Sequence, residues 1–314
     1  MIQTPDKLAP SPAPFVRDVL VARDGSIWLA GEDSSVYRLP VKGGNYHFSW
    51  EDMRYRGGDF PDCRTFTSLS QDKAGRIWTG TGNRGASVFN GTNWKTCDVV
   101  NALPGEHVFD IAADMHSGHV ALATSGGVAI YRPGSDSWHM LTRADGLTED
   151  QVESLAYAPD GSLWLAYSCG GLSRVVFPKE DANDPVAAPT MTHARAKWYW
   201  NTAQTVRQPS AGEGTGLPSN LNNALCVTPD HVVVAGTCAG IGYKTPKETW
   251  QFKRGKDYIE KNKYLASKSS AFPSRPPTGA PASNKYLPDD YVSALCLFGD
   301  KMAEATRDRG VALF

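Results

Sequence analysis

The chain has 314 residues, with 32 Lys and Arg against 33 Asp and Glu, and it contains 30 Gly and 21 Pro. This charge balance argues against a nucleic-acid or anionic membrane surface, because phosphate binding needs an excess of positive charge. No apolar run reaches the ~18 residues of a membrane span, so we expect no membrane insertion. The polar, Pro-rich N-terminus does not have the pattern of a signal peptide.

A short phrase recurs along the chain. Asp-Gly-Ser-Ile-Trp at 24–28 returns as Ala-Gly-Arg-Ile-Trp at 74–78 and as Asp-Gly-Ser-Leu-Trp at 160–164. Gly in the turn tolerates positive φ, and Val, Ile, Tyr and Trp at alternating positions suit strands. Each copy continues through a Gly-rich corner into a third strand, then into a fourth strand marked by Trp50, Trp94, Trp138, Trp198 or Trp250. Four antiparallel strands per copy predict an all-β fold made of β-propeller blades.

The first strands of the copies are predicted to start at residues 16, 66, 108, 152, 222 and 292. This spacing predicts six four-stranded antiparallel blades in a single domain over 1–314. The last two intervals are longer than the others, which predicts insertions at 179–202 and 253–285. The second insertion is rich in Lys, Ser and Pro, so we expect it on the outside, where it could contact a partner or a second subunit.

The last copy ends at Phe314, after its third strand. Three arrangements stay open: residues 1–10 complete the blade, the blade stays three-stranded, or another chain fills the gap, because an open sheet edge is a liability. Cys169 and Cys238 occupy matching corners, which leaves open a disulfide or two free thiols. No metal or cofactor motif is recognised, so none is expected.

Functional side chains are expected where the corners and the links between copies crowd one face of the blades. Arginines, carboxylates, amides and aromatic rings on such a face suit a sugar, whose hydroxyls or carboxylate forked donors can bind. The candidate ligand-binding residues are Glu32, Arg64, Asn83, Arg84, His107, Gln151, Tyr167, Asn222, Asp290, Tyr291, Arg307 and Asp308.

Two function classes follow from this face. The first is a non-catalytic module that binds a carbohydrate or a protein partner. The alternative is a polysaccharide lyase that acts on uronate-containing glycans by β-elimination. That reaction needs a cation beside the carboxylate and a group that moves a proton, for which Arg84 or Arg307 with His107 and Tyr291 could serve.

The succession of an apolar strand, Asp-Gly-x-Ile/Leu-Trp, Gly-Gly-Val/Leu, an aromatic strand and Asp-Gly-Leu resembles the two-component-regulator propeller repeats of bacterial sensor proteins. Residues 152–175, preceded by Asp-Gly-Leu at 145–147, are the nearest copy. The resemblance implies a β-propeller that recognises ligands, often carbohydrate, or contacts proteins. It also implies a periplasmic or extracellular location.

Overall fold

The computed structural model describes residues 11–42, 45–46, 49–100, 103–177, 189–194, 213–253, 291–298, 301–306 and 310–313. The chain divides into two compact units, Met1–Val152 and Glu153–Phe314. Apart from two single-turn 3-10 helices, the secondary structure of these described ranges consists of strands. The all-β prediction is therefore confirmed, whereas the single-domain prediction stays a prediction.

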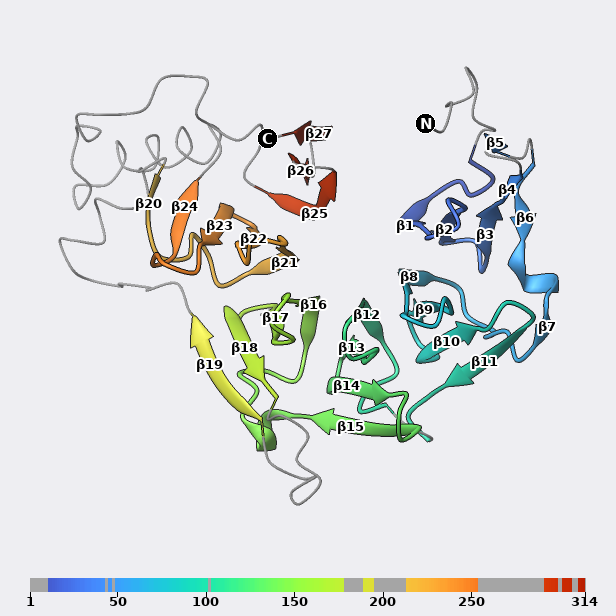
Figure 1. Ribbon diagram of the computed structural model, residues 1–314, viewed down its shortest axis with the longest axis horizontal. Coiled ribbons are helices and arrows are strands. Elements are labelled where there is room, and N and C mark those ends of the chain that lie inside the picture. The colour runs from blue at the N-terminus through green and yellow to red at the C-terminus, as the bar shows by residue number, and fades with distance from the viewer. Residues whose placement is uncertain are drawn as a thin grey trace. The chain divides into compact units, whose positions relative to one another are not determined.

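The first unit contains three blades, each built on four antiparallel strands that follow one another from the first strand to the fourth (Figure 1). Within this unit, the first strands of the three blades lie side by side. Blade one consists of β1 (Val16–Val21), β2 (Ile27–Gly31), β3 (Val36–Leu39) and β6 (Glu51–Asp52), with a small hairpin of β4 (Val41–Lys42) and β5 (Asn45–Tyr46) and the 3-10 helix η1 (Met53–Tyr55).

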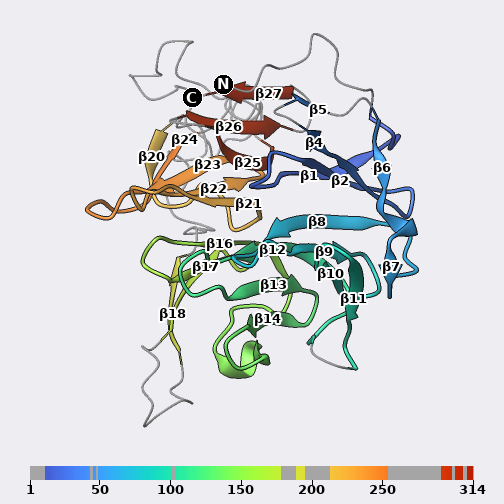
Figure 2. The same cartoon turned by 45° about the vertical axis from the view of Figure 1, so that its right-hand side comes forward.

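Blade two has five strands, because a short segment joins its outer edge. It consists of β8 (Phe66–Gln71), β9 (Ile77–Thr81), β10 (Ala86–Phe89), β11 (Asn93–Cys97) and β7 (Gly57–Gly58), which pairs with β11 in parallel. Blade three consists of β12 (Val108–Ala113), β13 (Val120–Thr124), β14 (Gly127–Arg132) and β15 (Ser137–Leu141), followed by the 3-10 helix η2 (Arg143–Asp145). Figure 2 shows β12, β13 and β14 as successive strands of one sheet.

The second unit contains two blades and a smaller sheet. Blade four consists of β16 (Val152–Tyr157, which starts at the last residue of the first unit), β17 (Leu163–Tyr167), β18 (Leu172–Val176) and β19 (Thr190–Ala194). Blade five consists of β21 (Asn222–Val227), β22 (Val233–Thr237), β23 (Gly240–Lys244), β24 (Gln251–Lys253) and an outer β20 (Glu213–Thr215). The C-terminal sheet has three strands, β25 (Val292–Phe298), β26 (Lys301–Thr306) and β27 (Gly310–Leu313).

The prediction of six four-stranded blades is wrong in its count. Five sheets have the four or five strands of a complete blade, and the C-terminal sheet has three. The predicted starts of the first strands, at residues 16, 66, 108, 152, 222 and 292, are nevertheless the observed ones. Closure of the last blade by residues 1–10 lies outside the described residues.

The predicted insertions at 179–202 and 253–285 lie mostly outside the described residues. The fourth strand of blade four, β19, falls inside the predicted insertion at 179–202, and the expected marker of that strand, Trp198, lies outside the described residues. The insertion at 253–285 lies outside them as well, except for Lys253. Pairing between β18 and β19 across a long connection has no local sequence signal, which explains the misplaced strand.

Neighbouring blades approach closely at their second strands. A Cβ on Gly80 of β9 would meet Val108 Cγ1 at 2.8 Å, and one on Gly236 of β22 would meet Val292 Cγ1 at 2.6 Å. Because the next blade's first strand presents a valine to each position, only a residue without a side chain fits there. The packing between blades is therefore tight at the inner strands and depends on larger side chains farther out.

Candidate functional site

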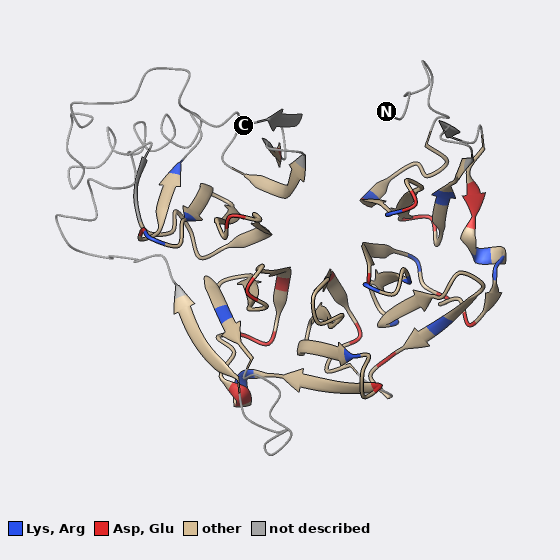
Figure 3. Ribbon diagram, in the orientation of Figure 1, with Lys and Arg blue, Asp and Glu red and all other residues tan. Residues whose placement is uncertain are grey.

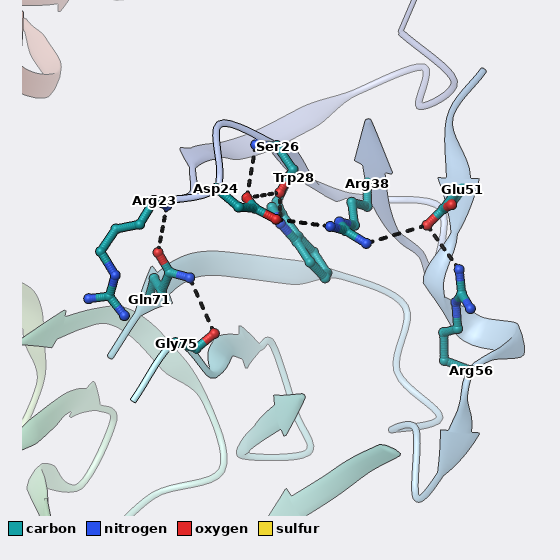
Figure 4. Close-up of polar contacts among 9 residues, drawn as sticks. All are labelled: Arg23, Asp24, Ser26, Trp28, Arg38, Glu51, Arg56, Gln71 and Gly75. Carbon is teal, nitrogen blue, oxygen red and sulfur yellow. Dashed lines mark hydrogen bonds and ion pairs between the residues drawn. The ribbon is translucent and has the colours of Figure 1, made fainter. Parts of the chain in front are cut away.

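The turn between the first and second strands is fixed by a carboxylate in blade one. Asp24 Oδ1 accepts hydrogen bonds from Ser26 N at 2.9 Å and Ser26 Oγ at 2.6 Å, and Trp28 Nε1 donates to Ser26 Oγ at 3.0 Å. Arg38 Nη2 on the third strand donates to Asp24 Oδ2 at 3.0 Å (Figure 4). The repeated Asp-Gly-Ser phrase is thus a local hydrogen-bonded turn that also ties the hairpin to the third strand.

Blade four repeats this network. Ser162 Oγ donates to Asp160 Oδ1 at 2.6 Å, and Arg174 Nη2 donates to Asp160 Oδ2 at 2.6 Å. Burial raises the pKa of Asp160, but the hydrogen bonds from Ser162 and the Arg174 guanidinium outweigh that effect, so its pKa lies below the usual value. Asp160 is therefore ionised at neutral pH, and its charge is offset by Arg174.

Blade two uses a different position for the same purpose. Asp72, two residues earlier in the turn, is only 1% exposed and accepts from Arg76 N at 2.9 Å, Arg76 Nε at 2.6 Å and Trp78 Nε1 at 2.9 Å. In blade five Thr228 occupies the position of Asp72, and its Oγ1 accepts from Val232 N at 3.0 Å. The turn of blade five therefore lacks a carboxylate at the Asp72 position.

Polar contacts also link blade one to blade two within the first unit. Arg23 N donates to Gln71 Oε1 at 2.8 Å, and Gln71 Nε2 donates to Gly75 O at 3.2 Å (Figure 4). On the other side of the same turn, Glu51 lies 3.8 Å from Arg38 Nη1 and 2.9 Å from Arg56 Nη2. The charged groups of this junction are thus engaged with one another.

Aromatic side chains fill the two junctions between blades in the first unit. The Trp28 ring packs on Phe89 of blade two with centroids 6.0 Å apart, and the Trp78 ring packs on Tyr131 of blade three at 5.5 Å. Phe89 and Tyr131 occupy the same register position, since Phe89 pairs with Ile77 and Tyr131 pairs with Val120, the first residues of their second strands. Each junction is therefore closed by an aromatic side chain of the third strand.

The junction between blades four and five has a different residue at that position. Lys244 pairs with Val233, the first residue of β22, so a lysine stands where Phe89 and Tyr131 stand in the first unit. The tryptophans are kept: Trp164 and Trp250 meet edge to face, with centroids 5.9 Å apart and planes at 80°. The replacement leaves the space beside Trp164 open.

A cleft of about 610 Å³ lies at this junction, entirely within the second unit. Its size is that of a site for a small molecule or a short oligomer. Blade four and blade five both contribute to its wall, which consists of Ala158, Asp160, Ser162, Trp164, Arg174, Thr192, His193, His231, Val233, Lys244, Thr245, Pro246 and Trp250.

The charged groups of this cleft are predominantly basic. Asp160 is the single carboxylate of the described wall and is paired with Arg174, whereas no ion pair joins Lys244 to another described residue. His193 Nδ1 lies 2.7 Å from Ser173 Oγ. Elsewhere in both units, basic and acidic residues are interspersed on the blades (Figure 3). The cleft thus combines aromatic rings with an excess of potential hydrogen-bond donors.

Most of the sequence-predicted site residues in the described ranges lie at corners between second and third strands or in links between blades, whereas the cleft includes turns between first and second strands. Arg64, Asn83, Arg84 and Gln151 are exposed. The partly exposed members of the set are Glu32, which forms an ion pair with Arg17, His107, whose ring stacks on Phe109 at 4.1 Å, and Tyr291. Their ligand-binding role stays a prediction.

Two predicted site residues are buried. Tyr167 is 0% exposed, because every residue of β17 is buried and its side chain belongs to the core. Asn222 is 1% exposed, and its Nδ2 donates to Gly171 O at 3.0 Å and to Asn220 O at 2.8 Å. Asn222 therefore links blade five to blade four rather than presenting its amide nitrogen to a ligand.

The remaining predicted site residues, Asp290, Arg307 and Asp308, lie outside the described residues. The proposed lyase group is divided in the same way, with Arg84 and His107 in the first unit, Tyr291 in the second and Arg307 not described. Its geometry is untested, so the lyase alternative stays a prediction.

The cleft residues were not predicted as a site from the sequence. The repeated turn was interpreted as a structural element, although its Asp160 and Ser162 line the cleft. A signal was present, because alignment of the third strands places Lys244 in the register of Phe89 and Tyr131. This position holds a buried apolar residue in the other four blades, Leu39, Phe89, Tyr131 and Val175, so a charged residue there indicates an opening in the packing.

The open question of the cysteines has an answer. Cys169 and Cys238 do not form a disulfide, and Cys238 Sγ lies 3.2 Å from Ser219 Oγ. Burial raises the pKa of Cys63 and of Cys97 to about 11, so these thiols are protonated at neutral pH.

In the part of the chain that the structure describes, no group of three or more His, Cys, Asp or Glu side chains is placed to hold a metal ion.

Comparison with known proteins identifies the fold. No protein-family model matches the sequence, and no curated protein matches it either. Among solved structures, PorZ, a surface component of the type-IX secretion system of Porphyromonas gingivalis, is 15% identical with a TM-score of 0.59, over 97% of this chain and 41% of that one. The extracellular domain of the putative hybrid two-component system BT3049 of B. thetaiotaomicron is 13% identical, with a TM-score of 0.55, over 96% and 40%.

The WD40 repeats of RRP9 are also similar, at 10% identity and a TM-score of 0.60, over 100% of this chain and 81% of that one. At such identities the likeness shows the fold, that of a β-propeller, and at this level the resemblance to propellers of two-component-system proteins is confirmed. This chain spans about two fifths of the length of PorZ and BT3049. Among its described residues, no helix has the length and apolar character that crossing a membrane requires.

Proposed function

We propose that this chain is a non-catalytic binding module that recognises a carbohydrate through the cleft between blades four and five. The observation that carries the proposal is the cleft itself, in which Trp164 and Trp250 stand beside Asp160, Arg174 and Lys244. A pocket lined by aromatic rings and a few polar groups is the usual form of a small-molecule site.

The cleft chemistry suits a sugar ring. The apolar face of a pyranose can lie on an indole, and Trp250 is the more exposed of the two tryptophans. The Asp160 carboxylate and the Arg174 guanidinium, already held in position by their mutual bond, can accept from and donate to neighbouring hydroxyls. Pre-positioned polar groups reduce the entropy that binding would otherwise cost.

We further propose a periplasmic or extracellular location. The support is that the similar domain of BT3049 is described as extracellular, and that PorZ is described as a bacterial surface component. A protein partner is the other ligand class expected from the sequence. The insertion at 253–285 and the three-stranded C-terminal sheet stay the predicted contacts for such a partner.

Isothermal titration calorimetry of the purified chain against a panel of neutral and acidic oligosaccharides tests the proposal. We expect at least one saccharide to bind, and the Trp250→Ala variant to lose about tenfold or more in affinity, the equivalent of one stacking contact. Tyr55→Ala is the matched control, because Tyr55 is an exposed aromatic residue in the first unit, at 83% exposure. Absence of binding across the panel, or equal affinity of wild type and Trp250→Ala, would contradict the proposal.

A further inference from the structure

Two residues of the wall that blade five contributes to the cleft carry a nitrogen donor that the matching residues of blades one, two and four lack. The first is Lys244, at the register position of Phe89 and Tyr131. The second is His231, in the turn that precedes β22. Both side chains line the cleft.

His231 adopts a backbone conformation that favours glycine. Its φ is 61°, and the matching turn positions in blades one, two and four hold Gly25, Gly75 and Gly161, with φ of 81°, 90° and 79°. A histidine in this conformation costs stability relative to glycine, and such strain is concentrated at functional sites. The turn of blade five thus keeps an imidazole at the cleft in a place where the fold itself favours glycine.

The opposite wall, which blade four contributes, has no described carboxylate left over to pair with these two side chains. Its one carboxylate, Asp160, is already engaged by Arg174 at 2.6 Å and by Ser162 at 2.6 Å. A ligand that enters the cleft therefore meets the Lys244 ammonium and the His231 imidazole, and Asp160 is the only acidic side chain of the described lining. An anionic group on the ligand would supply the missing counter-charge.

We propose that the ligand is a carboxylated sugar, of the uronic acid class, bound with its carboxylate toward Lys244 and His231 and its ring on Trp250. This inference rests on the proposed carbohydrate-binding function and specifies its ligand class. The carboxylate gains a charge-assisted hydrogen bond from Lys244, which a neutral sugar of the same ring cannot form. Preference for the acidic sugar follows from this difference.

The test compares oligogalacturonate with the matched neutral galactose oligomer by calorimetry, at low and at high salt. We expect about tenfold or stronger preference for the acidic oligomer, reduced as salt screens the charge. Lys244→Met keeps the length of the side chain and removes its charge, so it should remove the preference for the acidic oligomer. Lys244→Phe introduces the aromatic residue of the two junctions in the first unit and should abolish binding of both oligomers.

Lys247→Met is the matched control, because Lys247 is an exposed lysine three residues from Lys244 that does not line the cleft. Equal affinity for the acidic and neutral oligomers, or an unchanged preference in Lys244→Met, overturns the inference while carbohydrate binding stands. Binding of no saccharide at all overturns the proposed function together with it. Thermal melting shows whether each variant is folded, and Lys244→Phe is expected to melt no lower than wild type because it fills a cavity.

Discussion

The junction between blades two and three and the junction between blades four and five both contain a pair of tryptophans, but one third-strand position holds Tyr131 in the first and Lys244 in the second. In the first, Trp78, Tyr131 and Trp138 form a continuous aromatic cluster, with the rings of Trp78 and Trp138 6.1 Å apart. In the second, Trp164 and Trp250 meet at nearly the same distance, but Lys244 replaces the aromatic residue between blades. Repeat architecture thus allows a site to open at one junction while equivalent junctions maintain the core.

The largest expected effect is the loss of a tryptophan from the closed junction. Trp78 is 1% exposed and donates a hydrogen bond to Asp72, so Trp78→Ala should lower the free energy of unfolding by about 3–5 kcal/mol. Trp250→Ala should cost less, roughly 1–3 kcal/mol, because its ring borders open space. Urea denaturation at 25 °C measures both. Equal losses would mean that the two junctions pack equally well.

The second largest effect concerns the carboxylates in the turns between first and second strands. The loss of stability should be larger when Asp72 is removed than when Asp160 is removed. Removal of Asp72 leaves the N–H groups of Arg76 and Trp78 buried without an acceptor, so Asp72→Ala should cost about 2–4 kcal/mol. Asp160 is exposed, with a side-chain exposure of 39%, and Asp160→Ala should cost about 1 kcal/mol or less. The same denaturation experiment checks this order, and a reversed order would refute it.

The pH dependence of stability should have opposite signs at two carboxylates. Burial raises the pKa of Asp18 to about 7, with a further contribution from Asp110 and a partial offset from the backbone N–H groups of Leu69 and Val19. Between about pH 4 and pH 7 the folded chain therefore keeps a proton that the unfolded chain has lost, and stability falls as pH rises. Asp18→Asn should remove this fall and be more stable than wild type at pH 8 by about 1–2 kcal/mol, after allowance for partial exposure.

Asp160 provides the contrast for this measurement. Its pKa is lowered, so its contribution is present above the pKa of the unfolded chain and is lost as pH falls through the folded pKa. Denaturation of wild type, Asp18→Asn and Asp160→Asn from pH 3 to pH 9, expressed as differences from wild type, separates the two effects. Parallel curves for the two variants would show that the charge environments of the two blades do not differ.

The smallest expected effect is a gain in stability. His231→Gly replaces a residue at φ 61° with the residue that the matching turns use, so it should stabilise the chain by about 1 kcal/mol. The same variant should bind the acidic oligosaccharide more weakly. Thermal melting and calorimetry on one preparation measure both changes. A stabilised variant with unchanged affinity would show that the strained turn does not serve the cleft.

Much of the fold was predictable because its signals are local. The turn phrase and the alternating apolar residues placed the first strands correctly, including β21 at Asn222 and β25 at Val292. The number of strands in each blade was not predictable from such local signals. The pairing of β19 with β18 joins segments separated by a long connection, and no residue near Thr190 marks the strand.

The candidate site was missed because it depends on packing between blades. Lys244 has no special meaning within its own strand, and its importance appears only beside Trp164 of the preceding blade. Tyr167 was misplaced for a related reason. Second strands such as β17 are buried along their whole length, so alternation along the sequence does not distinguish a core side chain from one at a corner.

The short strands β7 and β20 have a consequence for assembly. They occupy the outermost positions of blades two and five, where β11 and β24 would otherwise present unpaired backbone groups. A foreign strand that pairs with β11 or β24 must first displace a segment of the protein's own chain, and β7 and β20 themselves offer edges of only two and three residues.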